Sequence, residues 1–323
     1  MPQNNIHSLG HNNMQNNAKI AILFPCYNEE HAIGEVISSF QAAIPEAVIY
    51  VYDNNSTDNT VEIAINAGAI VRREPSQGKG NVIRRMFCDI EADFYILADG
   101  DGTYSSKDAR KLLSLAQDNQ LDMVTGNRQN VQKDAGRSGH AFGNRLFNFL
   151  FRKMFSDGFE DIFSGYRVFS RRFVKSFPAL STGFETETEL CVHTLMLKLP
   201  FDEVEVSYGR RMEGSTSKLS TFRDGFHILG TFVLLMKEVK PFVFFGYLAI
   251  FALLLSVYFG APVLLEYYKT GLVSLMPRWI LSVGLASVSL LLFVSGLILD
   301  SVARGRVEHK RLAYLKIPVW VAK

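Results

Sequence analysis

The chain has 323 residues and a mass of 36.3 kDa, enough for one large domain or two ordinary ones. Hydrophobic residues make up 48% and charged residues 20%, a composition that excludes a mainly disordered chain. The net charge of +2 argues against nucleic-acid binding. Three well-separated cysteines without a CxxC pair argue against a disulfide framework or a cysteine-based zinc site, and fit a reducing compartment.

The first two thirds of the chain alternate between strand-like and helix-like segments. Residues 1–18 are rich in Asn, Gln and His, so we expect a disordered tail rather than a signal peptide. The apolar runs that predict strands are Lys19–Pro25, Val48–Asp53, Ala69–Arg73 and Phe94–Ala98. The segments that predict helices are Glu30–Phe40, Thr57–Ala67, Gly78–Cys88 and Ser106–Gln117. This alternation predicts an α/β domain with a mostly parallel sheet, whose ligands gather at the carboxyl ends of the strands.

The C-terminal third contains two long apolar segments, Phe242–Leu265 and Trp279–Leu299, without a charged residue. Each is long enough to cross a hydrocarbon core of about 30 Å. The alternative, a pair of buried core helices, would overfill a domain of this size. The basic residues that flank the pair outnumber those in its loop: Lys237, Lys240, Arg304, Arg306, Lys310 and Arg311 against Lys269 and Arg278. The positive-inside rule therefore predicts a hairpin with the α/β domain and the C-terminus in the cytoplasm.

Two further stretches, Asn144–Phe155 and Thr221–Lys240, have the composition of amphipathic helices at a membrane surface. Helices that pack on a sheet show the same pattern. For the first stretch both interpretations stay open. For the second we favour the membrane interface, because it leads directly into the first apolar segment.

Four polar motifs follow the predicted strands in order. They are PCYNEE (25–30), DNNSTD (53–58), QGKG (77–80) and DGDGTY (99–104). Each alone is typical of a turn or a helix start, but together at successive strand ends they indicate one binding site.

Asp99 and Asp101 indicate a metal site. Residues two apart in an extended segment point the same way, so both carboxylates can meet one hard cation such as Mg²⁺ or Mn²⁺. Such a cation bridges a diphosphate and takes up the charge of the leaving group. Lys79, between two glycines at a helix start, suits a phosphate. The motifs GxxxxGK[ST] and GxGxxG are absent from the sequence, which argues against a nucleotide hydrolase and a dehydrogenase.

In this order the motifs resemble those of the inverting glycosyltransferases of family 2, which have the Rossmann-like GT-A fold. The resemblance covers about Ile20–Leu219, where DIFSGYR (161–167), GFETE (183–187) and RRMEGSTSKL (210–219) look like later motifs of that family. With the hairpin, the chain resembles the polyprenyl-phosphate sugar synthases, which use dolichyl or undecaprenyl phosphate. The expected organisation is a disordered tail (1–18), a GT-A domain (19–220), an interfacial helix (221–240), a transmembrane hairpin (241–300) and a cytoplasmic tail (301–323).

The resemblance implies roles for the residues that bind the donor. Pro25, Tyr27 and Glu29 would line the nucleoside pocket, and Asp53 would accept a hydrogen bond from the ring N–H of the base. Lys79 would lie near the diphosphate.

The resemblance also implies a metal site and an acceptor site. Asp99 and Asp101 match the metal-binding DxD motif; many synthases continue it with Leu-Gln, where this chain has Gly102-Thr103. The basic and polar residues implied for the acceptor phosphate are Arg128, Arg137, Arg211 and Ser217. The candidate catalytic residues are Asp99, Asp101, Arg128, Arg137, Arg211 and Lys218.

The acceptor's chemistry decides which protein groups the reaction needs. A lipid monophosphate already offers an anionic oxygen, so its attack on the anomeric carbon requires cations rather than a strong base. A hydroxyl acceptor would require a carboxylate base, for which Glu185 and Glu187 are candidates. We favour a structural or substrate-orienting role for Glu187, and we expect Asp161 to hold the acceptor loop.

The predicted function is the Mg²⁺- or Mn²⁺-dependent, inverting transfer of one sugar from a UDP- or GDP-hexose to a polyprenyl phosphate. The enzyme would be a multi-pass protein of the cytoplasmic membrane, with its catalytic domain in the cytoplasm. The expected partners are the nucleotide sugar, the lipid phosphate, the membrane and further copies of the chain in a homo-oligomer, but no nucleic acid. Two alternatives stay open: transfer to a hydroxyl of a lipid-linked glycan, and a catalytically silent membrane scaffold.

Overall fold

The computed structural model describes residues 18–128, 158–181, 185–209 and 233–321, together with residues 149, 151–152, 155 and 230. The predicted N-terminal tail lies outside the described residues, except for Ala18.

The described residues form one mixed sheet with the strand order β3-β2-β1-β4-β6-β5-β7. Its strands are β1 (Ile20–Cys26), β2 (Val48–Asp53), β3 (Ile70–Arg73), β4 (Phe94–Leu97), β5 (Met123–Arg128), β6 (Arg167–Ser170) and β7 (Phe201–Val206). Strand β6 is antiparallel to both of its neighbours, whereas the other pairings are parallel. The sheet is therefore mostly parallel, as the sequence predicts.

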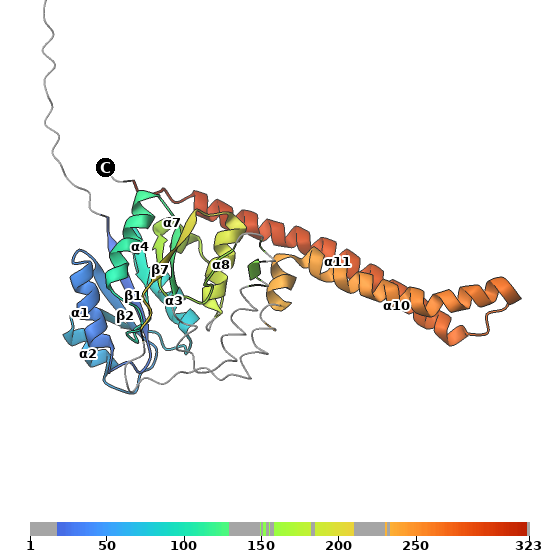
Figure 1. Ribbon diagram of the computed structural model, residues 1–323, viewed down its shortest axis with the longest axis horizontal. Coiled ribbons are helices and arrows are strands. Elements are labelled where there is room, and N and C mark those ends of the chain that lie inside the picture. Colours follow the sequence, from blue (N-terminus) through green and yellow to red (C-terminus); the bar gives the residue numbers. More distant parts are fainter. Residues whose placement is uncertain are drawn as a thin grey trace, which may run out of the picture.

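Helices cover both faces of this sheet, and two long helices extend from it (Figure 1). The helices are α1 (Ile33–Ala43), α2 (Thr60–Asn66), α3 (Lys79–Asp89), α4 (Lys107–Asp118), α7 (Arg171–Ser176), α8 (Thr186–Leu197), α10 (Pro241–Thr270) and α11 (Met276–Leu315). One buried cluster joins the sheet to α1, α2 and α4, and a second joins it to α3, α7 and α8. The predicted α/β class is confirmed.

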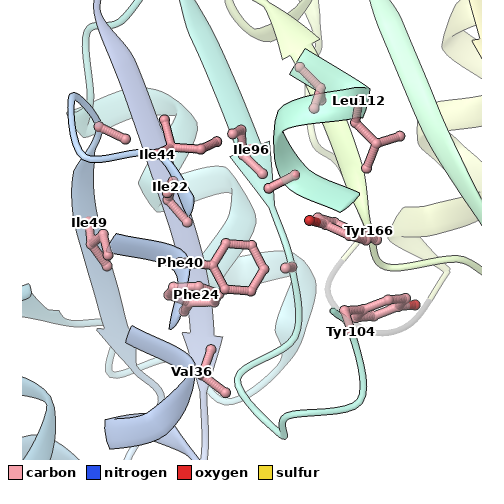
Figure 2. Packing of buried hydrophobic residues seen from close by; sticks show 14 of the residues in the cluster. Ile22, Phe24, Val36, Phe40, Ile44, Ile49, Ile96, Tyr104, Leu112 and Tyr166 are labelled. Carbon is pink, nitrogen blue, oxygen red and sulfur yellow. The ribbon is translucent and has the colours of Figure 1, made fainter. Parts of the chain in front are cut away.

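Strand β1 is apolar on both faces because each face packs on a helical layer. Ile22 and Phe24 belong to the first cluster and Leu23 to the second. Figure 2 shows Phe24 beside Phe40 of α1, and the two rings meet edge to face with centroids 5.1 Å apart. This burial on two sides is the reason why the strand reads as a continuous apolar run.

The first helix begins at Ile33, three residues later than the sequence predicts. The backbone N–H of Glu29 donates to Thr60 Oγ1, and that of Glu30 donates to Asp58. These bonds hold the residues before the helix in a loop that contacts the segment between β2 and α2 and the first residue of α2. A strand-end loop thus takes the place of the predicted first turn.

Helices α10 and α11 lie side by side and project from the sheet domain as a hairpin (Figure 1). Ser256 and Ser282 each donate a hydrogen bond of 2.8 Å to the other's carbonyl oxygen, and Gly260 packs against Ser282. Only 28% of the apolar stretch of α10 and 17% of that of α11 are buried. The alternative of two buried core helices is therefore wrong, and both helices are long and apolar enough to cross a membrane.

Helix α11 continues beyond the predicted apolar segment, through residues assigned to a C-terminal tail. It reaches Leu315 and packs against α7 and α8 of the sheet domain. Residues 301–315 are therefore helical and docked, where the sequence predicts a tail.

The two amphipathic stretches are described only in part. Phe151 is fully buried in the second core cluster, which favours packing on the sheet for that portion of Asn144–Phe155. Residues 233–239 are helical; Leu235 and Val239 pack against the same cluster, whereas Leu234 is exposed. The membrane-interface helix at 221–240 stays a prediction.

A buried histidine makes the stability of this domain depend on pH. His193 of α8 lies edge-on to the rings of Phe173 and Phe177, and its Nε2 is 3.3 Å from Ser176 Oγ. Burial lowers the pKa of His193 to about 3, and Lys310 adds to this effect. Between pH 6.5 and 3 the unfolded chain binds a proton that the folded chain does not bind, so the free energy of unfolding falls as the pH falls.

We expect the melting temperature to drop between pH 7 and pH 5, and His193→Leu to reduce this drop. The group contributes about 1–2 kcal/mol over this range. Thermal unfolding of the purified protein at both pH values measures the difference. His31→Leu, at a site with a side chain 58% exposed, is the control. An equal drop in His193→Leu and the wild type would contradict the prediction.

Candidate functional site

The site lies where the order of the strands reverses, between β1 and β4. In such sheets, the crevice beyond the carboxyl ends of the two strands is where ligands bind. The PCYNEE loop leaves β1 and the DGDGTY loop leaves β4 at this edge. The two loops touch, because Gly100 lies against Cys26; a Cβ at Gly100 would come within 2.6 Å of Cys26 Sγ. A side chain at position 100 would push the loops apart.

The loops after β1 and β2 are joined by hydrogen bonds. The Asn28 N–H donates to Ser56 Oγ at 2.9 Å, and the Thr57 N–H donates to Asn28 Oδ1 at 2.8 Å. Asn28 has a left-handed φ of 53°, a conformation that asparagine adopts more readily than most residues. Pro25, Tyr27 and Glu29 are half-buried beside these contacts, and Asp53 is buried. The structure thus brings together the four residues predicted for the nucleoside.

Asn54 ties a third loop to this edge, a role that the sequence did not assign to it. Its amide donates to the carbonyl oxygens of Glu74 and Ser76, and its Oδ1 accepts from the Gly78 N–H at 2.7 Å. These bonds fix the turn that leads into α3, where Lys79 begins the helix. The side chain of asparagine has both donors and an acceptor, so it can bond to the C=O and N–H groups of a neighbouring backbone segment. The position of Asn54 directly after a strand is the sequence feature that could have predicted this role.

Lys79 bridges two carboxylates at the centre of the site. Its Nζ lies 2.6 Å from Asp99 Oδ1 and 2.6 Å from Glu187 Oε1. Burial alone would lower the pKa of the Lys79 ammonium, but Asp99 and Glu187 outweigh this effect and raise it well above its ordinary value. The lysine is therefore a permanent cation, shared between the DxD loop and the start of α8. Among the residues that the structure describes, none makes a hydrogen bond to the buried Glu187 Oε2.

Asp101 is oriented by the residue two positions after it. Thr103 donates to Asp101 Oδ1 from its hydroxyl at 2.6 Å and from its N–H at 3.1 Å. Gly102 between them has a φ of +75°, which glycine adopts without strain. The Gly-Thr that replaces the Leu-Gln of many synthases thus forms a turn that holds the second aspartate.

Carboxylates of the strand-end loops lie near enough to Cys26 to act on its thiol. Burial raises the pKa of the Cys26 thiol well above its ordinary value, and four nearby carboxylates raise it further, those of Glu29, Asp53, Asp99 and Asp101. Within the described part of the chain, no three His, Cys, Asp or Glu side chains are grouped closely enough to hold a metal. Asp99 and Asp101 supply two carboxylates from one loop, and Mg²⁺ or Mn²⁺ can take one or two carboxylates from a protein and its other ligands from phosphate and water.

Arg128, predicted to bind the acceptor phosphate, is held by Asp161. Its Nε and Nη2 donate to the two carboxylate oxygens at 2.6 and 2.8 Å, and its guanidinium lies 5.4 Å from the centre of the Tyr208 ring. Asp161 thus holds the arginine at the end of β5, a fixed bidentate arrangement.

Tyr104 connects this pair to the DxD loop. Burial raises the pKa of the Tyr104 phenol, while Arg128 acts to lower it and Asp99 to raise it. Both charged residues therefore lie near one hydroxyl, which accepts a hydrogen bond from the Gly165 N–H at 2.9 Å. Arg128, predicted to bind the acceptor, and Asp99, the first aspartate of the DxD motif, therefore lie near the same tyrosine.

The DIFSGYR segment reaches the site because β6 runs in the opposite direction to its neighbours. Strand β6 begins at Arg167, which pairs with Leu97 at the carboxyl end of β4. The segment that precedes β6 therefore lies at the carboxyl ends of the parallel strands. Arg167 is fully buried and donates to the carbonyl oxygens of Ile162 and Ser164, which fixes the loop before β6. Gly165 in this loop lies against Asp99, where a Cβ would come within 2.7 Å of Oδ2. The sequence showed the motif but not the role of Arg167.

Four of the predicted site residues, Arg137, Arg211, Ser217 and Lys218, lie outside the described residues. Their roles stay predictions. Gly209, the last described residue before three of them, donates its N–H to the Thr103 carbonyl at 2.8 Å. The described chain therefore ends, at this point, beside the DxD loop.

Known proteins resemble the chain in both sequence and structure. The model of the family "Glycosyl transferase family 2" matches residues 21–177. Glycosyltransferase AglJ of Haloferax volcanii is 35% identical over 229 residues, which are 70% of this chain and 75% of that protein. The dolichyl-phosphate hexose transferase of the same organism is 28% identical over 207 residues, 64% of this chain and 89% of its own length.

The fold has a counterpart among solved structures. Glucosyl-3-phosphoglycerate synthase from Mycobacterium tuberculosis, in complex with Mn²⁺, UDP-glucose and phosphoglyceric acid, aligns with a TM-score of 0.55 at 21% identity. The alignment covers 67% of this chain and 79% of that one, and it shows that the two share a GT-A fold. The family match, the sequence of AglJ and the strand-end site agree, and this chain belongs to glycosyl transferase family 2.

Proposed function

We propose that this enzyme transfers one sugar from a nucleotide diphosphate sugar to a polyprenyl phosphate at the cytoplasmic face of the membrane, with inversion at the anomeric carbon. The observation that carries the proposal is the combination of a strand-end glycosyltransferase site with an apolar hairpin in the same chain. The likeness to a dolichyl-phosphate hexose transferase supports a lipid phosphate as the acceptor. The basic residues on either side of the hairpin support the cytoplasmic placement.

The donor would bind over the loops after β1, β2 and β4. Asp53 and the PCYNEE loop would hold the nucleoside, and Lys79 would stand near the diphosphate. Asp99 and Asp101 would hold Mg²⁺ or Mn²⁺, which supplies positive charge to the departing diphosphate when bound. The complex of the mycobacterial synthase with Mn²⁺ and UDP-glucose supports this choice of cofactor and donor class.

The position of Glu187 argues against its acting as the base for a hydroxyl acceptor. A hydroxyl needs a base that is open to the substrate, but Glu187 is 5% exposed and its Oε1 is bound to Lys79. Its place suits a residue that positions Lys79 and Asp99. A phosphate acceptor needs cations instead, and Arg128 stands at the same edge of the sheet.

The direct test supplies membranes containing the protein with labelled UDP- and GDP-sugars and undecaprenyl phosphate, with Mn²⁺ or with EDTA. We expect one donor to label the lipid extract with Mn²⁺, and EDTA to abolish the labelling. The same membranes with an added lipid-linked sugar test the alternative acceptor. Extension of that sugar, without any labelled lipid phosphate, would establish transfer to a hydroxyl instead.

Weakening the ion pair between Asp161 and Arg128 is expected to reduce binding of the acceptor and to leave binding of the donor unchanged. In Asp161→Asn the bidentate ion pair of 2.6 and 2.8 Å loses its charge, so the KM for the lipid phosphate should rise about 10-fold. The KM for the nucleotide sugar should stay unchanged. Glu46→Gln, which removes the charge from the exposed pair of Glu46 with Arg110, is the matched control. A rise in the donor KM alone would contradict this assignment of Arg128.

A further inference from the structure

The end of α11 is attached to the sheet domain by a buried tyrosine. Tyr314 is only 6% exposed, and its hydroxyl donates to Asp122 Oδ2 at 2.8 Å. One turn earlier, Arg311 donates to the carbonyl oxygen of Leu197 at the end of α8. The helix that leaves the apolar hairpin is therefore bonded directly to the catalytic domain.

Asp122, Arg172 and Tyr314 form one closed cluster, which we call the latch. The Asp122 side chain is fully buried, and its Oδ1 accepts from Arg172 Nε at 2.5 Å and from Ser170 Oγ at 2.6 Å. The Arg172 guanidinium lies 4.9 Å from the centre of the Tyr314 ring. Each member thus contacts the other two, and removing one would leave a buried charge or ring without its partner.

The latch lies at the amino ends of the parallel strands, whereas the active site lies at their carboxyl ends. One residue of the latch, Asp122, is next to the strand that carries Arg128. Asp122 directly precedes β5, and Arg128 ends this strand. Trp320 makes a second contact between the C-terminal segment and the sheet, because its ring meets that of Phe94 edge to face with centroids 5.3 Å apart. Phe94 begins β4, the strand that leads to Asp99. The C-terminal segment therefore contacts the amino ends of the two strands whose carboxyl ends carry the proposed metal and acceptor residues.

No proline lies in the interior of α11, and the helix is continuous from Met276 to Leu315. Such a helix transmits its orientation from the hairpin to the latch. An acceptor embedded in a bilayer reaches the active site only when that site is held at a suitable height and angle, and small errors in such positioning cost large factors in rate.

We infer that Tyr314, with Asp122 and Arg172, is a positioning residue that holds the catalytic sheet in a fixed orientation to the membrane hairpin, so that a membrane-embedded acceptor can reach the active site. This inference rests on the proposed lipid-phosphate acceptor. The latch acts on the encounter with the acceptor, while binding of the nucleotide sugar and the chemical step are independent of it.

The test compares two acceptors in the full-length protein, reconstituted in vesicles. One acceptor is undecaprenyl phosphate in the bilayer, and the other is a short, water-soluble prenyl phosphate. In Tyr314→Leu we expect kcat/KM to fall at least about 10-fold for the bilayer acceptor and to stay within about 2-fold for the soluble one. Tyr314→Phe, which keeps the ring and loses only the hydrogen bond, should show a smaller loss with the same preference. Leu312→Ala, at a position 59% exposed on the same helix, is the control.

A second measurement reports the orientation of the catalytic domain relative to the membrane and does not depend on sugar transfer. Cys88 is exposed, whereas Cys26 and Cys191 are buried, so a maleimide dye labels α3 of the intact protein selectively. Energy transfer from this dye to headgroup-labelled lipid should give a narrow distribution in the wild type and Leu312→Ala, and a broad one in Tyr314→Leu.

The outcomes separate the latch from the proposed function. An equal fall with both acceptors, or no change in either activity or energy transfer, would overturn the inference. If the wild type labels neither acceptor, the proposed function fails; a broadened distribution in Tyr314→Leu would still support the latch, and an unchanged one would overturn it.

Discussion

Lys79→Met is expected to lower both the stability of the protein and its rate of sugar transfer. Without the ammonium, the partly exposed Asp99 carboxylate and the buried Glu187 carboxylate both lose the cation that lies between them. Breaking a buried ion pair in this way costs about 3–5 kcal/mol of unfolding free energy, and loss of the cation near the diphosphate should reduce transfer about 100-fold or more. Thermal unfolding and transfer to the lipid extract measure the two effects.

A double variant separates these effects. Lys79→Met with Glu187→Gln also removes the charge of the buried carboxylate that Lys79 contacts, so it should recover part of the melting temperature and none of the activity. Lys107→Met, at an exposed position on α4, is the control for the loss of a lysine. If activity returns together with stability in the double variant, Lys79 supports the fold alone and has no role at the diphosphate.

Asp101→Asn is expected to reduce metal-dependent transfer about 1000-fold, with little change in the melting temperature. The amide keeps the size of the carboxylate and loses the charge that would hold the cation. Thr103→Val should give a smaller loss of about 10-fold, because Asp101 then lacks the hydroxyl that fixes it at 2.6 Å. Titration of transfer with Mn²⁺ should show a higher half-saturating concentration for Thr103→Val.

The control for this pair is Asp118→Asn, at an exposed carboxylate near the end of α4. Full activity of Asp101→Asn in Mn²⁺ would exclude this aspartate as a ligand. A loss in Thr103→Val that excess Mn²⁺ cannot reduce would show that Thr103 acts on something other than the metal.

Short sequence patterns predicted the strands and the loops at their ends, because these depend on neighbouring residues in the chain. Strands β1, β2 and β4 are short apolar runs because they are buried, and their observed bounds lie within one residue of the prediction at each end. The four strand-end motifs meet because parallel strands place their carboxyl ends at one edge. The sequence could not show the direction of β6, since nothing within Arg167–Ser170 distinguishes an antiparallel strand from a parallel one.

The contacts that were missed join residues far apart in the chain. Lys79 was expected near a diphosphate, but its link to Glu187 depends on how α8 packs against α3. The latch from Asp122 to Tyr314 spans most of the chain in the same way. Such pairs follow from the packing of whole elements, and the residue type alone carries no information about the partner.

The length of α11 has a consequence for the geometry of the proposed membrane-bound enzyme. Its 40 residues correspond to a rod of about 60 Å, roughly twice the hydrocarbon thickness of a bilayer. A helix pair adapts to a thinner or thicker bilayer by tilting, and a change of about 10° moves the far end of such a rod by about 10 Å. With the catalytic domain fixed to that end, the thickness of the surrounding lipid would change the tilt of the domain, and with it the orientation of the active site toward the membrane surface.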